Sequence, residues 1–517
     1  MDTSAGCSIS VWMATAARPE FSSLAKSECA DVCIVGAGIA GLTTAYLLTK
    51  TGKSVIVLDD GPIGSGETER TTAHLATVLD DRLFELERLH GADGAKLAAE
   101  SQAAAIDTIE RIVREERIDC DFERVDGFLF NAPEQTADLL DRELATARSA
   151  GFTDIEIVDR VPLLSFNTGR ALRFRRQAQF HPLKYLAALA QAIVRDGGRI
   201  FTGTHVTKIT GGKSAQVETS GGSSVSCTAI VMATHTPVND RLVIHTKQAA
   251  FRTYVIGVDV PVGTVPKALY WDTDDPYHYV RLVGTKASGP APAQEMLMVG
   301  GEDHKTGQAD DAGTRYALLE QWTRERFPMA TEIRFRWSGQ IMVPVDGLAF
   351  IGRNPLDDEN IYIATGFSGN GLTYGTIAGL LLTDLINGSE NQWAQLYSPS
   401  RVTLASAEEF LRSTANIAVQ YLDWLTGGGV EKDRLVPPCT GGVVRHGLTQ
   451  VAVYRDPNGT LHECSAVCPH LGGIVAWNHE EKTWDCPVHG SRFDRMGPVL
   501  NGPANEDLPP VEVAAPT

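Results

Sequence analysis

Long hydrophobic runs and basic charge are both scarce in this sequence. No window approaches the roughly 18 consecutive apolar residues that a transmembrane helix needs. The 46 Lys and Arg residues are outnumbered by 64 Asp and Glu, for a formal net charge of -18. That balance argues against nucleic acid or an anionic membrane surface as a partner. The first residues also lack the basic start and continuous apolar segment of a signal peptide.

Cysteine is too scattered to suggest a disulfide framework. The nine cysteines are odd in number, and most of them lie far apart along the chain. This pattern favours free thiols in a reducing compartment, so we expect a cytoplasmic protein. Hydrophobic residues make up 43% of the chain and charged residues 21%, as in ordinary soluble globular proteins, and 517 residues suffice for two or three domains.

Composition and turn signals divide the chain into four parts. We expect an extended leader over residues 1–29 and a large domain over 30–400. A helix and the linker-like stretch "TGGGVEKDRLVPP" follow within 401–430, and a β-rich domain with many Gly and Pro turns occupies 431–517.

The stretch "DVCIVGAGIAGLTTAYLLTKTGKSVIVLDD" predicts a strand, a glycine-rich turn, a helix and a second strand. Gly36, Gly38 and Gly41 form G-x-G-x-x-G at the mouth of the helix, where backbone N–H groups can approach a pyrophosphate. Asp59 ends the second strand, where a carboxylate can bind a ribose hydroxyl. The motif itself fits FAD or NAD. Its place near the start of a long chain, with no second copy later, favours FAD.

Further stretches resemble the family of FAD-dependent amine and D-amino-acid oxidases, which contains glycine oxidase and sarcosine oxidase. They are "GPIGSGETERTTAHLA", "FHPLKYLAALAQAI", "VMATH" and "DGLAFIG…NIYIATGFSGNGLTYG", in that order. The resemblance implies FAD-binding segments at about 30–80, 180–235 and 340–390, with a substrate domain at about 80–180 and 240–340. The fold we expect is an α/β FAD-binding Rossmann-like domain with an interleaved α+β substrate domain and a small C-terminal all-β domain.

The same resemblance implies which residues surround the flavin. Glycines at a helix N-terminus can stabilise the negative charge of reduced flavin. In some relatives a His of a Thr-x-His segment is joined covalently to the flavin, and Thr72-Ala73-His74 resembles that segment; a histidine that is only hydrogen-bonded there is the alternative. Besides the first glycine turn and Asp59, the expected FAD-binding residues are Ser65, Thr72, His74, Thr234, Gly352, Gly366, Gly369, Asn370, Gly371 and Thr373.

The substrate site departs from the family pattern. Relatives that bind amino acids grip the carboxylate with an Arg shortly before the late Asp-Gly, and Ile341 stands at that place here. A carboxylate needs a cationic partner. A simple α-amino acid is therefore disfavoured as substrate unless Arg252, Arg281 or Arg334 substitutes.

Aromatic side chains could form a pocket for a cationic amine. Each of them is more simply explained as a core residue, and His181 and His235 are more simply structural than catalytic. The candidates are Tyr254, Tyr270, Trp271, Tyr277, Tyr279 and Trp337.

The last tenth of the chain holds "CPHLGGIVAWNHEEKTWDCPVHGSRFD". Cys468, His470, Cys486 and His489 could bind zinc, but each loop supplies one Cys and one His rather than a like pair. That arrangement lets two Cys bind one iron and two His the other. The stretch resembles the Rieske family, which implies a [2Fe-2S] cluster.

Departures from high-potential Rieske proteins bear on the redox potential. Gly473 and Val488 stand where those proteins carry a disulfide, and Phe493 replaces a Tyr that donates to the cluster, while Ser491 is kept. With fewer donors, we predict a potential in the lower or middle part of the Rieske range. Cys464 is expected to be a bystander.

Together the two halves predict an FAD-dependent dehydrogenase of an amine or N-substituted amine. Electrons would pass singly to the cluster and then to an external carrier. The alternative is a reductase or monooxygenase-type enzyme that receives electrons through the cluster. A Rieske oxygenase is disfavoured, because we find no His pair for a mononuclear iron outside the last domain.

Overall fold

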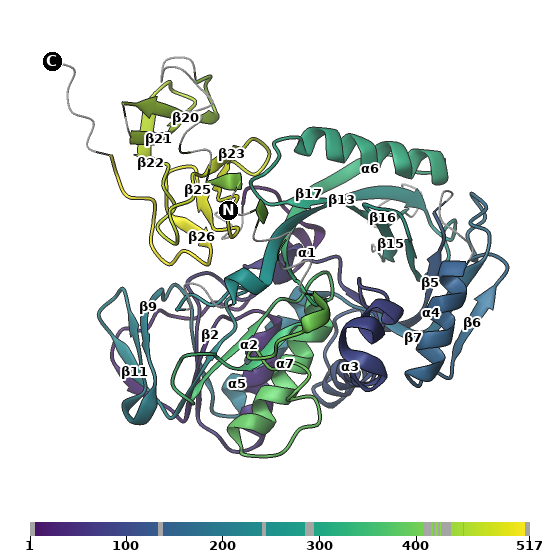
Figure 1. Cartoon of the computed structure of the whole chain (residues 1–517), viewed down its shortest axis with the longest axis horizontal. Coiled ribbons are helices and arrows are strands. Elements are labelled where there is room, and N and C mark those ends of the chain that lie inside the picture. The colour runs from purple at the N-terminus through teal and green to yellow at the C-terminus, as the bar shows by residue number, and fades with distance from the viewer. Residues whose placement is uncertain are drawn as a thin grey trace.

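A computed structural model provides the structure of the chain. Figure 1 shows two layered sheets with helices around them and a small β domain, in yellow, that carries the C-terminus. In the described part of the chain, no helix has the length and apolarity to cross a membrane. The residues described are 6–132, 138–239, 244–284, 294–406, 411, 415–416, 419–421, 424, 436–447 and 449–511.

The first sheet is mostly parallel, as expected for dinucleotide binding. Its central strands are short apolar runs buried on both faces, one face against helices and the other against a small sheet that contains Val217 and Val225. Only the edge strand β18 runs antiparallel to its neighbour. The strand order is β18 (Phe350–Arg353), β19 (Ile361–Thr365), β12 (Ala229–Met232), β2 (Val32–Val35), β3 (Val55–Leu58) and β8 (Arg199–Phe201).

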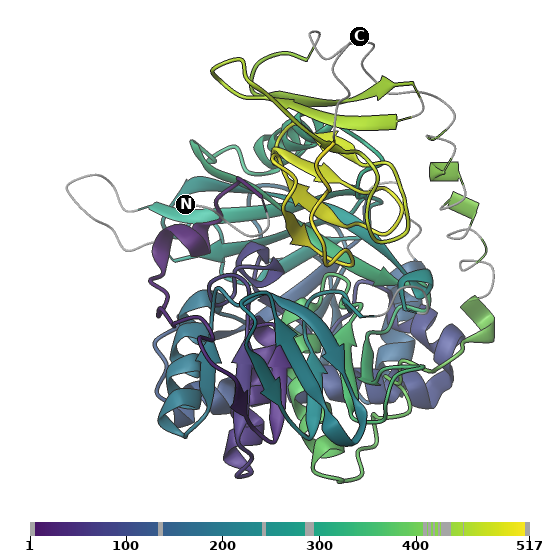
Figure 2. The same ribbon diagram turned by 90° about the vertical axis from the view of Figure 1, so that its left-hand side faces the viewer.

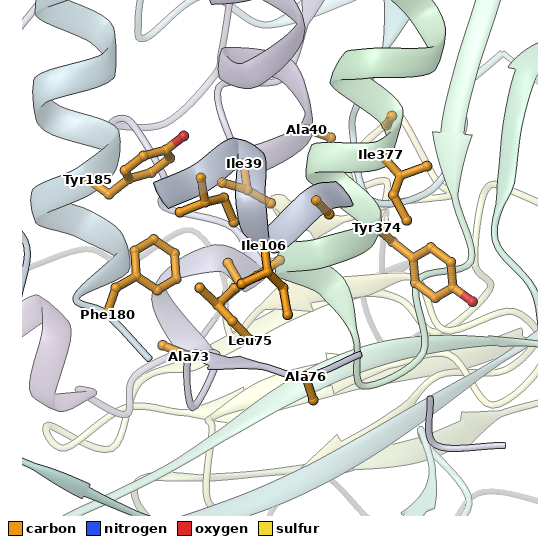
Figure 3. Close-up of a cluster of buried hydrophobic side chains, with 14 of the residues drawn as sticks. Ile39, Ala40, Ala73, Leu75, Ala76, Ile106, Phe180, Tyr185, Tyr374 and Ile377 are labelled. Carbon is orange, nitrogen blue, oxygen red and sulfur yellow. The ribbon is translucent and has the colours of Figure 1, made fainter. Parts of the chain in front are cut away.

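Helices α2 (Ile39–Lys50), α5 (Pro182–Arg195) and α7 (Gly371–Ile386) cover this sheet. Small residues let α7 lie close to α2, because a Cβ on Gly375 would come within 2.6 Å of the Ile39 side chain. Figure 3 shows the buried cluster around Ile39, Tyr374 and Ile377, which anchors the start of both helices.

The second sheet is larger and largely antiparallel, and its strands come from the segments predicted to form the substrate domain. Helices α4 (Asp138–Ser149) and α6 (Ala312–Arg326) pack on it, and α3 (Leu83–Glu115) packs on α4 and α7. Its path runs through β17 (Ile333–Pro344), β13 (Gln248–Pro261), β16 (Gln294–Lys305), β15 (His278–Val283), β14 (Leu269–Asp272), β5 (Glu123–Phe130), β7 (Ala171–Gln179) and β4 (His74–Leu75), with β6 (Ile155–Val158) beside β7.

The C-terminal domain consists of two small antiparallel sheets with their own core around Trp477 and Trp484. Figure 2 shows this domain lying on top of the larger body. The all-β prediction is confirmed. Its strands are β20 (Thr440–His446), β21 (Thr449–Arg455), β22 (Leu461–Ser465), β23 (Ala476–Asn478), β24 (Thr483–Asp485), β25 (Arg492–Asp494) and β26 (Val499–Asn501).

The N-terminal segment differs from the extended leader that the sequence predicted. Helix α1 (Val11–Thr15) is buried, and the indole of Trp12 donates to the Thr71 carbonyl at 2.6 Å. Strand β1 (Glu28–Cys29) then joins a small sheet with β11 (Ser224–Ser226), β10 (Gln216–Thr219) and β9 (Val206–Thr210). A five-residue helix and a two-residue strand are too short to leave a periodic hydrophobic pattern in the sequence. The helix and linker expected over 401–430 lie largely outside the described residues.

Candidate functional site

A cavity of about 410 Å³ is lined by residues from both large sheets and from the C-terminal domain. Most of the predicted FAD-binding residues meet there, although they come from three distant segments. Those that line it are Gly36, Gly38, Asp59, Ser65, Thr72, His74, Thr234, Gly369, Asn370 and Gly371.

The glycine turn gives the cavity a backbone surface. Gly36 has a φ of +107°, and a Cβ there would overlap the carbonyl oxygen of Ala233. The N-terminus of α2 borders the cavity at Gly38, so the positive end of the helix dipole faces it. Glycine at position 36 therefore allows the tight turn, and the helix N-terminus beside it suits a pyrophosphate.

Asp59, directly after β3, lines the cavity next to the glycine turn. Its carboxylate accepts hydrogen bonds from the N–H groups of Ala37 at 2.6 Å and Gly61 at 2.8 Å. Burial, together with the neighbouring Asp60 carboxylate, raises the pKa of Asp59 to about 7. Its place after β3, on the wall of the cavity, agrees with the predicted ribose-binding role, which stays a prediction.

Four predicted residues support the cavity without lining it. A Cβ on Gly41 would overlap the Gly36 carbonyl, so Gly41 lets α2 pack beneath the turn. Gly366 has a φ of +74° beside Pro344. Gly352 lies against Pro399, and Thr373 donates to the Asn370 carbonyl at 3.1 Å.

His74, the first residue of β4, lines the cavity. Its Nδ1 lies 3.1 Å from the Thr72 hydroxyl, and burial lowers the pKa of His74 to about 3, so the ring is neutral. Within the described part of the chain, the buried Nε2 has no hydrogen-bond partner. A buried polar atom without a partner is costly, and a bound cofactor would relieve that cost.

Three of the six aromatic candidates, Trp271, Tyr277 and Tyr279, line the other end of the cavity. Tyr279 stands edge-on to His74, with ring centroids 5.6 Å apart. The remaining three, Tyr254, Tyr270 and Trp337, are core residues. His181 caps α5 and binds Thr15, outside the cavity, whereas His235 lines it.

None of the three arginines considered as carboxylate binders lines the cavity, although Ile341 does. Arg252 pairs with Glu481 of the C-terminal domain, and Arg334 pairs with Asp259. The Arg281 guanidinium donates to the Thr72 carbonyl at 3.1 Å and so fixes the loop that precedes β4.

Two half-buried carboxylates that the sequence did not single out, Asp80 and Asp303, lie at this end, together with the exposed Asp274 and with Arg82. Asp80 accepts from the Gly369 N–H at 2.6 Å and so holds the second glycine turn. Asp303 has a buried Oδ1 without a hydrogen-bond partner among the described residues. Burial raises the pKa of Asp303 to about 7.

The four predicted metal ligands come together in the C-terminal domain. The rings of His470 and His489 lie 5.1 Å apart, and Cys468 and Cys486 are hydrogen-bonding neighbours. Sulfur and nitrogen ligands are therefore grouped in separate pairs, which suits one iron with two Cys and one with two His. Burial lowers the pKa of His489 to about 3, so its ring is neutral, as ligation requires.

Backbone donors surround the sulfur ligands. Cys468 is reached by the N–H groups of His470 and Leu471 and by the Ser491 hydroxyl. Gly473 is needed for space, since a Cβ there would lie 3.0 Å from the Cys486 sulfur. These donors would stabilise the negatively charged sulfurs of a bound cluster. The predicted potential stays a prediction.

Two stretches match known families. Residues 31–385 match the family described as FAD dependent oxidoreductase, and residues 432–512 match the Rieske [2Fe-2S] domain. The chain belongs to the FAD-dependent oxidoreductase family. Its cofactors are FAD and a [2Fe-2S] cluster.

This FAD-dependent oxidoreductase is similar to two-domain and one-domain proteins. The Rieske 2Fe-2S iron-sulfur protein YhfW of Bacillus subtilis is 32% identical, over 97% of each chain. Gamma-glutamylputrescine oxidoreductase of Escherichia coli is 25% identical over 72% of this chain and 87% of its own. Glycine oxidase from Geobacillus kaustophilus has the same fold, with a TM-score of 0.58 and 21% identity over 72% of this chain and 99% of its own.

In this FAD-dependent oxidoreductase the two cofactor regions share a tight interface. A Cβ on Gly307 would lie 2.8 Å from the Pro487 nitrogen, beside the ligand Cys486. The ring of His245, from the larger body, lies 4.9 Å from that of His470. The amide of Gln340 donates to the Gly490 carbonyl at 2.8 Å. No sequence motif marks Gly307, His245 or Gln340.

Proposed function

We propose that the chain oxidises a cationic amine or N-substituted amine and delivers the electrons singly to an external carrier. The bound ammonium group would first lose its N–H proton. FAD would then supply the acceptor for a hydride from the carbon beside the neutral nitrogen, and the cluster would pass single electrons onward. The chain's own residues bind the amine, exclude water and keep the two cofactor regions in contact.

One observation carries the electron-transfer part of this proposal. Gln340 lines the FAD cavity, and its side chain contacts Gly490, the residue after the cluster ligand His489. Its backbone N–H also donates to the Glu67 carboxylate at 2.7 Å. Glu67 belongs to the stretch at 61–76 that resembles the family's loop beneath the flavin, called the flavin loop from here on. One residue therefore touches both cofactor regions, which supports transfer within the chain rather than separate functions.

The presence of Asp303 supports an amine as substrate. None of the three arginines considered as carboxylate binders lines the cavity, and Arg82, which does, donates to the Asp272 carbonyl at 3.3 Å. The aromatic pair Tyr277 and Tyr279, with ring centroids 5.5 Å apart, stands beside Asp303 in the cavity. Aromatic faces and a carboxylate attract an ammonium group. The similar gamma-glutamylputrescine oxidoreductase carries an amine compound in its name, which agrees with this choice.

An anaerobic experiment tests the proposal. A panel of mono-, di- and N-methylated amines is mixed with the oxidised protein, and flavin absorbance and low-temperature EPR are followed on the same sample. We expect an amine to bleach the flavin, and the EPR signal of the reduced cluster to follow. A flavin that stays oxidised with every amine, but is reduced when an electron donor reduces the cluster, would instead support the reductase alternative.

Asp303→Asn should raise the KM for the amine by about tenfold to a hundredfold, because a buried hydrogen bond to a charged group contributes about 1.5–3 kcal/mol. The wild-type KM should also rise as the pH falls below about 7, where the Asp303 carboxyl, with its raised pKa, becomes protonated. In Asp303→Asn this pH dependence should disappear. Steady-state kinetics between pH 6 and 8 measure both effects.

Asp274→Asn is the matched control, since Asp274 borders the same cavity but is exposed. Its KM should change less than that of Asp303→Asn at every pH. Equal effects in the two variants would mean that the cavity attracts cations by general charge, and would contradict a specific role for Asp303.

A further inference from the structure

The C-terminal Rieske domain contributes a wall to the FAD cavity. Strand β26 and the loop after it border the cavity together with the flavin domain. These residues lie more than 400 positions from the first glycine turn in the sequence, and they belong to the domain that holds the cluster. The lining residues of this wall are Val499, Leu500, Asn501, Gly502, Ala504 and Asn505.

The wall lies at the adenosine end. In a dinucleotide site the pyrophosphate occupies the helix N-terminus and the adenosine ribose meets the carboxylate after the second strand. Here that carboxylate is Asp59, and beyond it the cavity is bordered by Asp60, His205 and Val206. The aromatic residues lie at another part of the cavity, where Tyr277 is beside Asp80, the residue that holds the second glycine turn.

Specific contacts hold the wall in place. The Asn505 side-chain amide donates to the Val206 carbonyl at 3.0 Å, and His205 Nε2 lies 3.4 Å from the Asn505 carbonyl. The Asn501 amide donates to the Glu67 carboxylate at 3.1 Å. Glu67 belongs to the flavin loop, so the wall is fastened on two sides of the cavity.

The wall also fits closely against the flavin domain. A Cβ on Gly502 would lie 2.7 Å from the Thr236 hydroxyl. That hydroxyl is buried and makes no hydrogen bond within the described part of the chain. Thr236 lies two residues after Thr234, which lines the cavity. The close approach leaves no room for a side chain at position 502 between the wall and the flavin domain.

We propose that residues 499–505 of the Rieske domain form a lid over the adenosine half of bound FAD. FAD then contacts both domains, and a ligand that binds only the docked arrangement stabilises that arrangement by linkage. By reciprocity, docking of the Rieske domain tightens FAD by the same factor. The inference concerns cofactor binding and holds whatever the substrate is.

Binding of adenosine fragments tests the lid directly. Full-length protein is produced in riboflavin-starved cells, and ADP and FMN are titrated by calorimetry. We expect Asn505→Ala and the double variant Asn501→Ala/Asn505→Ala to weaken ADP binding by about threefold to tenfold per lost hydrogen bond, with FMN affinity unchanged. Glu506→Ala, an exposed neighbour in the same loop, should leave both affinities as in the wild type.

Hydrogen exchange supplies the reciprocal measurement. Amides of 499–505 should exchange more slowly with ADP bound than without it, and the EPR line shape of the reduced cluster should stay unchanged in every variant, which excludes misfolding. Unaltered ADP affinity in the double variant would overturn the proposal. Exchange in 499–505 that is the same with and without ADP would overturn it too, even if the variants bind ADP weakly.

Discussion

Replacing Cys486 with Ala is expected to abolish the EPR signal of the reduced cluster while the amine still bleaches the flavin. Cys486 is buried and stands beside Cys468, and a [2Fe-2S] cluster cannot be held with one thiolate on its sulfur-ligated iron. Turnover with a one-electron acceptor such as ferricytochrome c should fall by at least about 100-fold, equivalent to about 2.7 kcal/mol in the barrier. Anaerobic flavin bleaching by the amine should keep its rate within about twofold, because substrate is bound in the other domain.

Cys464→Ala provides the matched control. Cys464 is buried in the same small core. In the described part of the chain, its sulfur donates a weak hydrogen bond to the Ala452 carbonyl at 3.9 Å. This variant should keep the EPR signal and the one-electron turnover. If Cys486→Ala lost the cluster and kept its one-electron turnover, electrons would leave the flavin directly, and the proposed route would be wrong.

Residues whose chemistry is local in sequence could be predicted. Gly36, Gly38 and Gly41 act within one turn and one helix, and the four cluster ligands lie within two short loops. Their spacing alone fixes a backbone cradle or a set of metal ligands. The fold class followed from the same stretches, because a βαβ unit and a β-rich tail each leave a periodic pattern.

Residues whose role comes from strand pairing or domain docking could not be found in this way. Asp303 reaches the cavity because β16 pairs with β15, which places Tyr279 opposite Gly300. A period of two along β15 explains why Tyr277 and Tyr279 face the cavity while His278, between them, packs on Trp322. That alternation was visible in the sequence and could have separated these tyrosines from the core aromatic residues.

Arg252 illustrates the limit most clearly. Its charge made it a candidate for binding a substrate carboxylate, but the structure uses it to hold Glu481, which lies more than 200 residues later in another domain. A buried charge must be paired, and sequence does not reveal the partner when the pairing depends on how two domains dock. Gln340 and Asn505 could not be predicted for the same reason, because their hydrogen bonds cross the interface between the two domains.

Glu481→Gln should loosen the docking of the two domains, with a loss of about 3–5 kcal/mol, the usual cost of removing one partner from a buried ion pair. Glu481 is 1% exposed and lies 3.6 Å from Arg70 and 3.4 Å from Arg252, which are equally buried. It also accepts from the Ser8 hydroxyl at 2.6 Å and from Ser338. Without its charge, two buried guanidinium groups lose their main counter-charge. Thermal loss of the cluster's visible circular dichroism should begin at a lower temperature in this variant.

Lowering the pH should weaken the interaction of Glu481 with Arg70 and Arg252. Burial would raise the pKa of Glu481, but the charges of Arg70 and Arg252 outweigh burial and hold the pKa well below its usual range. A carboxylate whose pKa is depressed on folding contributes stability above its unfolded pKa of about 4.3, and that contribution is lost as the pH falls from there toward the folded-state pKa. The wild type should therefore lose more stability than Glu481→Gln between pH 5 and pH 3. Glu480→Gln is the control, because Glu480 is the exposed neighbour and should match the wild type at both pH values. Equal acid sensitivity in Glu481→Gln and Glu480→Gln would mean that other carboxylates, not this buried one, govern how the Rieske domain stays docked.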